Sequence, residues 1–285
     1  MANEVTISVV GTAAGAIVEK EALRAFYEAR KVAKEGVVLY KVLNDGGQYY
    51  DFHVLGALTV GAVNADGTIP SNTAWTHTQA RVTMDDWRGV NIRVPNRASS
   101  QSAFDYDKEF GIAGGEALGE DTDNQCLSLF ATFTSPAAIG NTTSPDAFAD
   151  ATIRGAIARL DNGKVPQKKR HAILHPVAHM QLLADSDFKR ADAVGKSEGI
   201  QVSGVVLPLY GITLLKTAVV NTSGSAHANM LIQEQAFGVV MNQEIKLAKH
   251  DKLGDYSVAH LGSYLGGFNV TRTACGIVMY SAVTS

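Results

Sequence analysis

The hydrophobic and polar positions of this chain switch between helical and strand spacing several times along its length. Between residues 17 and 34, apolar residues such as Leu23 and Phe26 recur every three or four positions, and charged residues occupy the other side. This spacing predicts an amphipathic helix that ends at Gly36. Residues 1–15 have no such period and predict an extended arm. The apolar stripe of the helix needs a partner to cover it.

Two runs rich in β-branched and aromatic residues, 49–63 and 75–94, flank a turn signal at Asp66-Gly67. They predict one long two-stranded hairpin over residues 48–94. A hairpin of this length is not stable alone in water, so its edges need cover, for instance from a neighbouring copy.

Apolar residues spaced by three and four predict a long helix over residues 103–133. Its glycines weaken it by roughly 1 kcal/mol each relative to alanine, and such glycines allow close packing or mark a bend. They are Gly111, Gly114, Gly115 and Gly119. Ser144 is the expected N-cap of a third helix, which Asn162-Gly163 closes.

The second half of the chain predicts mainly strands. We expect a buried strand over 170–175, a short helix over 176–184 and a polar flap over 185–199. Residues 205–215 are expected to form a strand, a turn and a strand, and further strands are expected over 230–241, 256–265 and 268–280. One short strand is also expected in the first half of the chain, over 37–42. Helices and strands fall in separate parts of the chain, which is typical of the α+β class.

Composition limits the kinds of partner. The 285 residues are 46% hydrophobic with a formal net charge of −3, so no global basic field recruits nucleic acid or an anionic membrane. Cys126 and Cys275 follow no metal or redox spacing and are interpreted as buried apolar residues in a reducing compartment. No apolar run reaches the roughly 18 residues of a membrane span, and the first residues lack the basic region of a secretory signal. We therefore expect a protein made and used in a cytoplasm.

Three histidines form the one arrangement that resembles a metal site. His171, His175 and His179 recur every four residues, the spacing of ligands on one helix face. Pro176 interrupts that helix, and the residues before it predict a strand. Packed or hydrogen-bonded histidines are therefore the favoured interpretation.

Two charged clusters also have a chemical and a structural interpretation. The basic run comprises Lys164, Lys168, Lys169 and Arg170. It could contact phosphate, but a solvated loop is the favoured interpretation. The carboxylate cluster comprises Glu116, Glu120, Asp121 and Asp123. It could act in acid–base chemistry, but a solvated or scaffold-facing helix face is favoured. No nucleophile elbow, phosphate-binding loop or dinucleotide fingerprint occurs. We expect no enzyme, no cofactor and no metal.

The order of the expected elements resembles the tailed-bacteriophage major capsid proteins of the Hong Kong 97 type. Three stretches carry the resemblance: the strand-to-helix step Ile173-Leu174-His175-Pro176, the strand, turn and return strand over 204–215, and the final strand pair over 257–279. The resemblance implies an α+β capsid fold with five parts. These are an N-terminal arm and helix (1–36), an extended hairpin loop (37–97), a peripheral domain with a spine helix (98–136), an axial domain (137–245) and further peripheral strands (246–285).

The resemblance implies a coat protein that assembles into pentamers and hexamers of an icosahedral head enclosing double-stranded DNA. Expected partners are other copies of the chain, a separate scaffolding protein, a portal and a decoration protein, with DNA enclosed without sequence-specific binding. The location would be the virion capsid, assembled in the host cytoplasm. Contacts between subunits are expected at Asn64, Asp66, Gly67, Pro70, Trp75 and Trp87.

Three alternatives remain open. The two tryptophans either pack the hairpin base against their own subunit or anchor a neighbour. The shell could instead be an encapsulin-like compartment enclosing cargo protein. The third alternative is a metal-dependent enzyme that uses the three histidines.

Overall fold

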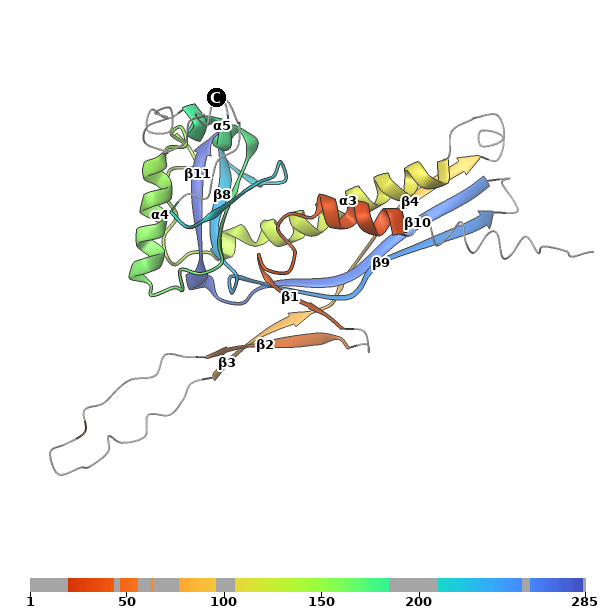
Figure 1. Ribbon diagram of the computed structural model, residues 1–285, viewed down its shortest axis with the longest axis horizontal. Helices are drawn as coiled ribbons and strands as arrows, with labels where there is room; N and C mark the ends of the chain where they lie inside the picture. Colours follow the sequence, from red (N-terminus) through yellow and green to blue (C-terminus); the bar gives the residue numbers. More distant parts are fainter. Residues whose placement is uncertain are drawn as a thin grey trace, which may run out of the picture.

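The computed structural model describes residues 20–43, 47–55, 63, 77–95, 106–184, 210–252 and 257–283. Figure 1 shows a long curved sheet with helices along one side, a compact unit at one end and a separate hairpin below. We call these the long-sheet unit, the short-sheet unit and the hairpin.

The long-sheet unit contains four strands in the order β1-β9-β10-β4. They are β1 (Leu39–Val42), β9 (Phe237–Lys252), β10 (Ser257–Val270) and β4 (Asp86–Pro95). β10 runs antiparallel to both of its neighbours, while β1 runs parallel to β9. The outer strands β1 and β4 come from the first third of the chain, so the sheet joins the two ends of the sequence.

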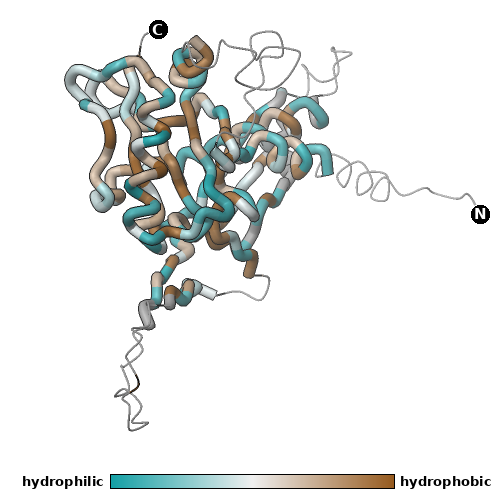
Figure 2. The backbone as a smooth tube through the Cα atoms, turned by 60° about the vertical axis from the view of Figure 1, so that its left-hand side comes forward, coloured by the Kyte–Doolittle hydropathy of each residue, from teal (hydrophilic) through white to brown (hydrophobic). Residues whose placement is uncertain are grey.

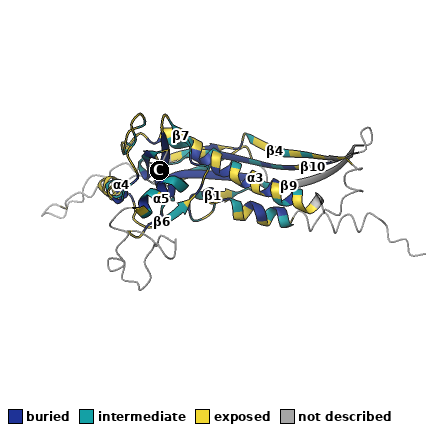
Figure 3. Cartoon of the chain, turned by 90° about the horizontal axis from the view of Figure 1, so that it is seen from above, coloured by how far each residue is buried: buried dark blue, intermediate teal, exposed yellow. Residues whose placement is uncertain are grey.

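Helix α3 (Tyr106–Ser128) lies along one face of the long sheet and continues into the short 3₁₀ helix η1 (Leu129–Thr132). The prediction of a long helix over 103–133 is confirmed for its described part. Figure 3 shows buried and exposed residues alternating along α3, because one side meets the sheet and the other faces outward.

A second helix, over residues 20–29, packs on α3 at two of the predicted glycines. A Cβ at Gly115 would stand 2.3 Å from the carbonyl oxygen of Ala22, and one at Gly119 would stand 2.8 Å from that of Phe26. No other residue fits there without displacing the backbone opposite. The expectation that these glycines permit close packing is confirmed at Gly115 and Gly119, and α3 covers the apolar stripe of the first helix.

The first helix ends earlier than predicted. Its last residue is Ala29, and Gly36 lies beyond a further stretch of turns. The carboxylate of Asp123 accepts hydrogen bonds from the backbone N–H groups of residues 31, 32 and 33. A continuing helix would donate these same groups to the carbonyls four residues earlier. Asp123 therefore terminates the helix by capturing its donors.

The short-sheet unit contains five strands, with β11, β8, β5 and β6 in order and β7 paired to β8. They are β5 (Arg170–Leu174), β6 (Thr213–Lys216), β7 (Thr222–Ser223), β8 (Ala226–Gln233) and β11 (Gly276–Ala282). Two helices flank this sheet, α4 (Asp150–Asn162) and α5 (Pro176–Ala184). The predicted strand at 170–175 and helix at 176–184 are confirmed.

Helix α4 begins later than predicted. Ser144 is not its N-cap, because the helix starts at Asp150 and Ala149 occupies the capping position. The backbone N–H of Phe148 donates to Gln181 Oε1 on α5 at 2.8 Å, which holds the approach to the helix in an extended form. The predicted closure at Gly163 is confirmed.

The predicted strands at 230–241 and 268–280 are each divided between the two sheets. The chain turns at residues 234–236, so β8 belongs to the short sheet and β9 to the long one. The expected domain boundary at 245/246 consequently falls inside β9. β11, expected among the peripheral strands, lies in the short sheet because it pairs with β8 along its length.

The prediction of one continuous hairpin over 48–94 is wrong beyond Thr83. β2 (Tyr49–Leu55) pairs with β3 (His77–Thr83), but β4 leaves the hairpin and pairs with β10. The sequence between β3 and β4 resembles a continuous strand, yet Met84 is buried between the hairpin and the long sheet. The hairpin therefore ends where the chain enters that sheet.

One apolar core extends through both sheet units. It includes Phe26 and Leu118 from the long-sheet side, Ile173 and Leu231 from the short sheet, and Phe237 at the junction. Figure 2 shows hydrophobic stretches running through the packed strands. Cys126 and Cys275 are buried as free thiols, as predicted. None of the described helices is long and apolar enough to cross a membrane.

Candidate assembly surfaces

The base of the hairpin is fixed on the long sheet by glycines. A Cβ at Gly267 of β10 would stand 2.0 Å from the carbonyl oxygen of Thr83, and one at Gly238 would stand 2.8 Å from the ring of Phe52. Asn269 Nδ2 also donates to the carbonyl oxygen of Arg81 at 2.8 Å. A small apolar cluster fills the contact; it comprises Val82, Met84 and Val240, with Leu43, Tyr50 and Phe52 packed against them.

The outer face of the hairpin carries an ordered polar cluster. Arg81 forms two parallel hydrogen bonds to Asp51, each of 2.9 Å, and its guanidinium carbon lies 3.9 Å from the ring centre of Tyr49. The hydrogen bonds from Arg81 lower the pKa of Asp51 below its usual value. Tyr49 remains half exposed. The strands thus present a mixed aromatic and charged surface on the side opposite the apolar contact with the long sheet.

Of the residues expected to contact a neighbour, only Trp87 belongs to the described part of the chain. Asn64, Asp66, Gly67, Pro70 and Trp75 lie outside it.

Trp87 lies on β4 of the long sheet, opposite Leu265, and not on the hairpin. Its side chain is 77% exposed, the highest value among the large apolar residues of the described chain. Leu261 on the adjacent strand is also exposed. Trp87 therefore does not pack the hairpin base, while a role in contacting a neighbour stays a prediction.

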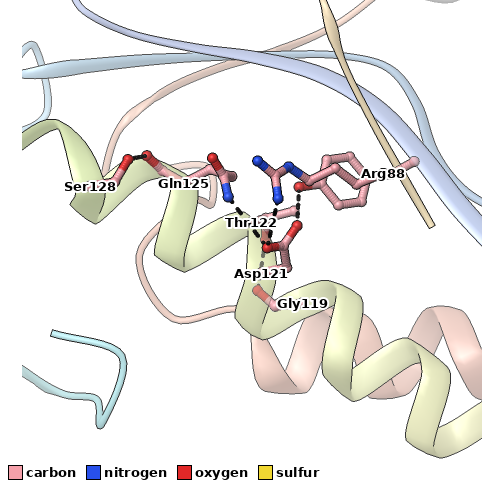
Figure 4. A network of polar contacts seen from close by, with 7 residues as sticks. Arg88, Gly119, Asp121, Thr122, Gln125 and Ser128 are labelled. Carbon is pink, nitrogen blue, oxygen red and sulfur yellow. Dashed lines mark hydrogen bonds and ion pairs between the residues drawn. The ribbon is translucent and has the colours of Figure 1, made fainter. Parts of the chain in front are cut away.

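A partly buried polar contact fixes β4 and β10 to α3. Asp121 accepts a hydrogen bond from the hydroxyl of Tyr264 at 2.6 Å and lies 3.6 Å from a guanidinium nitrogen of Arg88. Figure 4 shows Arg88 pointing from its strand toward Asp121 on the helix. Tyr264 is fully buried, and burial together with this bond raises the pKa of its hydroxyl. Asp121 is therefore a structural residue that lies on a partly exposed side of the helix.

Asp123 has a comparable role at the junction of the two units. Its bonds to residues 31–33 fix the segment that follows the first helix. The same segment reaches the short sheet, where His171 Nε2 lies 3.0 Å from the carbonyl oxygen of Gly36 and Lys31 Nζ donates to that of Lys216. Burial raises the pKa of the Asp123 carboxyl despite its three backbone donors. The solvated-face interpretation is wrong for Asp123, which is only 1% exposed.

Arg30 occupies an aromatic cage beside this segment. Its guanidinium carbon lies 4.9 Å from the ring centre of Phe26 and 4.7 Å from that of Tyr40. The hydroxyls of Tyr40 and Tyr27 both donate to Glu244 on β9. Burial and the bond to Glu244 raise the pKa of Tyr27 to about 12. A surface pocket of about 540 Å³ opens here, but the protein's own arginine already fills the aromatic cage.

The three histidines have separate environments. His171 bonds to Gly36, His179 is buried in α5, and the His175 ring stacks on His227 with 3.6 Å between ring centres. Across the described residues, no three His, Cys, Asp or Glu side chains are grouped so as to hold a metal ion.

The basic run is divided between surface and core. Arg170 is buried and donates to Asp161 at 2.7 Å, while Lys169 pairs with Glu234. The expectation of a solvated loop is therefore wrong for Arg170. Its guanidinium instead closes the turn between α4 and β5 through a further bond to the carbonyl oxygen of Val165.

The chain resembles known proteins in its three-dimensional structure. No protein-family model and no curated protein matches the chain. The capsid structure of cyanophage P-SCSP1u is 20% identical, with 90% of each chain covered and a TM-score of 0.68. A structure from Mycobacterium phage Che8 is 19% identical, with 89% of this chain and 90% of the other covered and a TM-score of 0.68.

The chain has the Hong Kong 97-type capsid fold. The expected α+β class is confirmed. A virus-like particle from Pyrococcus furiosus is also similar to this chain, at 13% identity, with 92% of this chain and 97% of the other covered and a TM-score of 0.60. The fold match spans both sheet units, so the surfaces described above belong to a chain with a capsid-type fold.

Proposed function

We propose that this chain is a tailed-phage major capsid protein, a structural subunit and not an enzyme. It would assemble into pentamers and hexamers of an icosahedral head that encloses double-stranded DNA. The observation that carries the proposal is the match to phage capsid structures over about nine-tenths of the chain. The exposed hairpin face and the 77% exposed Trp87 support it, because such surfaces are typical of contacts between subunits.

In this proposal the short-sheet unit is the axial domain near the symmetry axes, and the long-sheet unit is the peripheral domain. The hairpin would lie over the next subunit, so that its uncovered edges are satisfied only in the shell. Individual contacts of about −4 kcal/mol correspond to roughly millimolar affinity, which lets misplaced subunits leave during assembly.

Scaffolding, portal and decoration proteins belong to the same proposal, as do assembly in the host cytoplasm and location in the virion. DNA would be held by enclosure, because a net charge of −3 gives no global attraction for phosphate.

A compartment shell is the second candidate. The chain also resembles a virus-like particle from Pyrococcus furiosus, but its TM-score of 0.60 is below the 0.68 of the two phage structures described above, so the phage head is the first candidate.

Sedimentation of the full chain, expressed with and without a candidate scaffolding protein, tests the proposal. We expect fast-sedimenting closed particles. Nuclease-resistant double-stranded DNA in particles from infected cells would distinguish a phage head from a cargo compartment. Protein cargo without DNA would support the compartment instead, and a chain that stays monomeric under both conditions would overturn both candidates.

A further inference from the structure

Helix α5 begins at a histidine that acts as its cap. His175 follows β5 directly, and its Nδ1 accepts a hydrogen bond from the backbone N–H of Val177 at 3.2 Å. Val177 is the second residue of α5, so the ring takes the position that an N-cap oxygen usually occupies. The backbone N–H of His175 in turn donates to Asn229 Oδ1 on β8 at 2.7 Å. The cap therefore joins the helix to the sheet.

This capping bond requires a neutral ring. An Nδ1 that accepts from Val177 carries no proton, so the ring proton of His175 resides on Nε2. Protonation of Nδ1 would remove the acceptor and place a positive charge at the positive end of the helix dipole. Both effects would weaken the start of α5.

A second imidazole makes the same protonation more costly. The ring of His227, on β8, stacks on that of His175 with 3.6 Å between centres and 17° between planes. His227 is only 6% exposed, and neither of its ring nitrogens has a hydrogen-bond partner among the described residues. A charge on either ring would meet the other ring face to face, where the largely buried His227 has little water to screen it.

The neighbouring charged groups do not favour protonation of the pair. Electrostatic interaction with His227 lowers the pKa of His175. Lys216 on β6 likewise lowers the pKa of His179, which is buried one turn along α5. No carboxylate contributes to the pKa of any of the three rings within the described chain. Burial is the largest cause in each case, and it holds the pKa of all three below the usual value.

We propose that the stacked pair His175 and His227 is a proton-sensitive latch that holds α5 on the short sheet at neutral pH and releases it in acid. Because the closed form disfavours the protonated rings, the latch has its full strength above the ordinary histidine pKa of 6.5 and weakens as the pH falls below it. The equilibrium constant for opening should increase about tenfold for each unit by which the pH falls, for each imidazole that takes up a proton on opening.

Hydrogen–deuterium exchange of the full wild-type chain tests the latch between about pH 7.5 and about pH 5. After correction for the intrinsic exchange rate at each pH, the amides of α5 should lose protection at least tenfold more than those of β10 in the same sample. A ratio of α5 to β10 protection that stays constant over this range would overturn the latch. Assembly is not needed for this measurement, so failure of the shell proposal would leave the result interpretable.

Two variants identify the groups responsible. Asparagine is a strong N-cap residue that does not titrate, so His175→Asn should keep α5 in place and reduce its acid sensitivity. Adding His227→Phe to this variant retains an aromatic ring at position 227 and should abolish the remaining acid sensitivity of α5. His53→Gln, an exposed histidine on the hairpin, is the matched control and should keep the wild-type profile. If the double variant does not fold, His175→Asn alone decides, and an unchanged acid profile in that variant would contradict the latch.

Discussion

Gly267 on β10 lies so close to Thr83 at the end of β3 that a Cβ there would stand 2.0 Å from the threonine carbonyl oxygen. Real Cβ atoms do not approach backbone oxygen so closely. The contact lies where the hairpin leaves the long sheet, so the direction in which the hairpin projects is set by a glycine of its own subunit.

Substitution Gly267→Ala should therefore displace the hairpin base. Overpacking of this kind costs about 1–3 kcal/mol, and we expect a lower melting temperature together with a reduced yield of closed particles. Thermal unfolding and sedimentation of the same preparation would measure the two effects.

Gly114→Ala is the matched control. Nothing lies within 4 Å of a Cβ at this position of α3, so the substitution should stabilise the helix by up to about 1 kcal/mol. If Gly267→Ala is as stable and assembles as well as this control, the hairpin base does not depend on the glycine contact.

Asp123→Ala should loosen the segment that joins the two sheet units. Three backbone N–H groups would lose their buried acceptor, at a cost of about 1–3 kcal/mol each before any rearrangement. We expect lower resistance to urea and faster amide exchange at residues 31–33. Glu116→Gln, on the exposed side of the same helix, should leave both quantities unchanged. Equal behaviour of the two variants would show that the cap is dispensable.

Tyr264→Phe tests the contact that fixes the long sheet to α3. The variant retains the buried ring and removes only the hydroxyl that donates to Asp121, so we expect a loss of about 1–2 kcal/mol in the free energy of unfolding. Tyr49→Phe, which alters an exposed ring on the hairpin, should cost less than about 0.5 kcal/mol. Urea unfolding of both variants provides the comparison, and a Tyr264→Phe curve that superimposes on the wild type would refute a stabilising bond.

Trp87→Thr should separate stability from assembly. The side chain is 77% exposed and threonine suits an edge strand, so the melting temperature of the free subunit should change little. If Trp87 anchors a neighbour, the yield of closed particles should fall, since buried tryptophans often dominate contacts between proteins. Unimpaired assembly would remove Trp87 from the subunit interface.

Local patterns predicted those elements whose signals lie within a few consecutive residues. The strand at Arg170–Leu174 and helix α5 follow directly from a buried apolar run and from a proline at the first helical position. The glycines of α3 also predicted a close neighbour, but they did not identify that neighbour as the helix over residues 20–29. Asp123 follows Gly119 by four residues and precedes Cys126 by three, so helical spacing places it on the buried side of α3. This position could have identified it as an internal cap.

Long-range pairing was not predictable in the same way. The residues of β3 and β4 both suit strands, and nothing local indicates that β4 pairs with β10 from the far end of the chain. The stacking of His175 on His227 likewise depends on β8 lying beside β5. Such contacts depend on which strands become neighbours, whereas local periodicity describes only one strand at a time.

Electron microscopy of the purified full chain, expressed alone and with a candidate scaffolding protein, tests the central claim most directly. The account predicts closed icosahedral particles of uniform size in at least one of the two preparations. Dispersed monomers or small irregular oligomers in both preparations would contradict it.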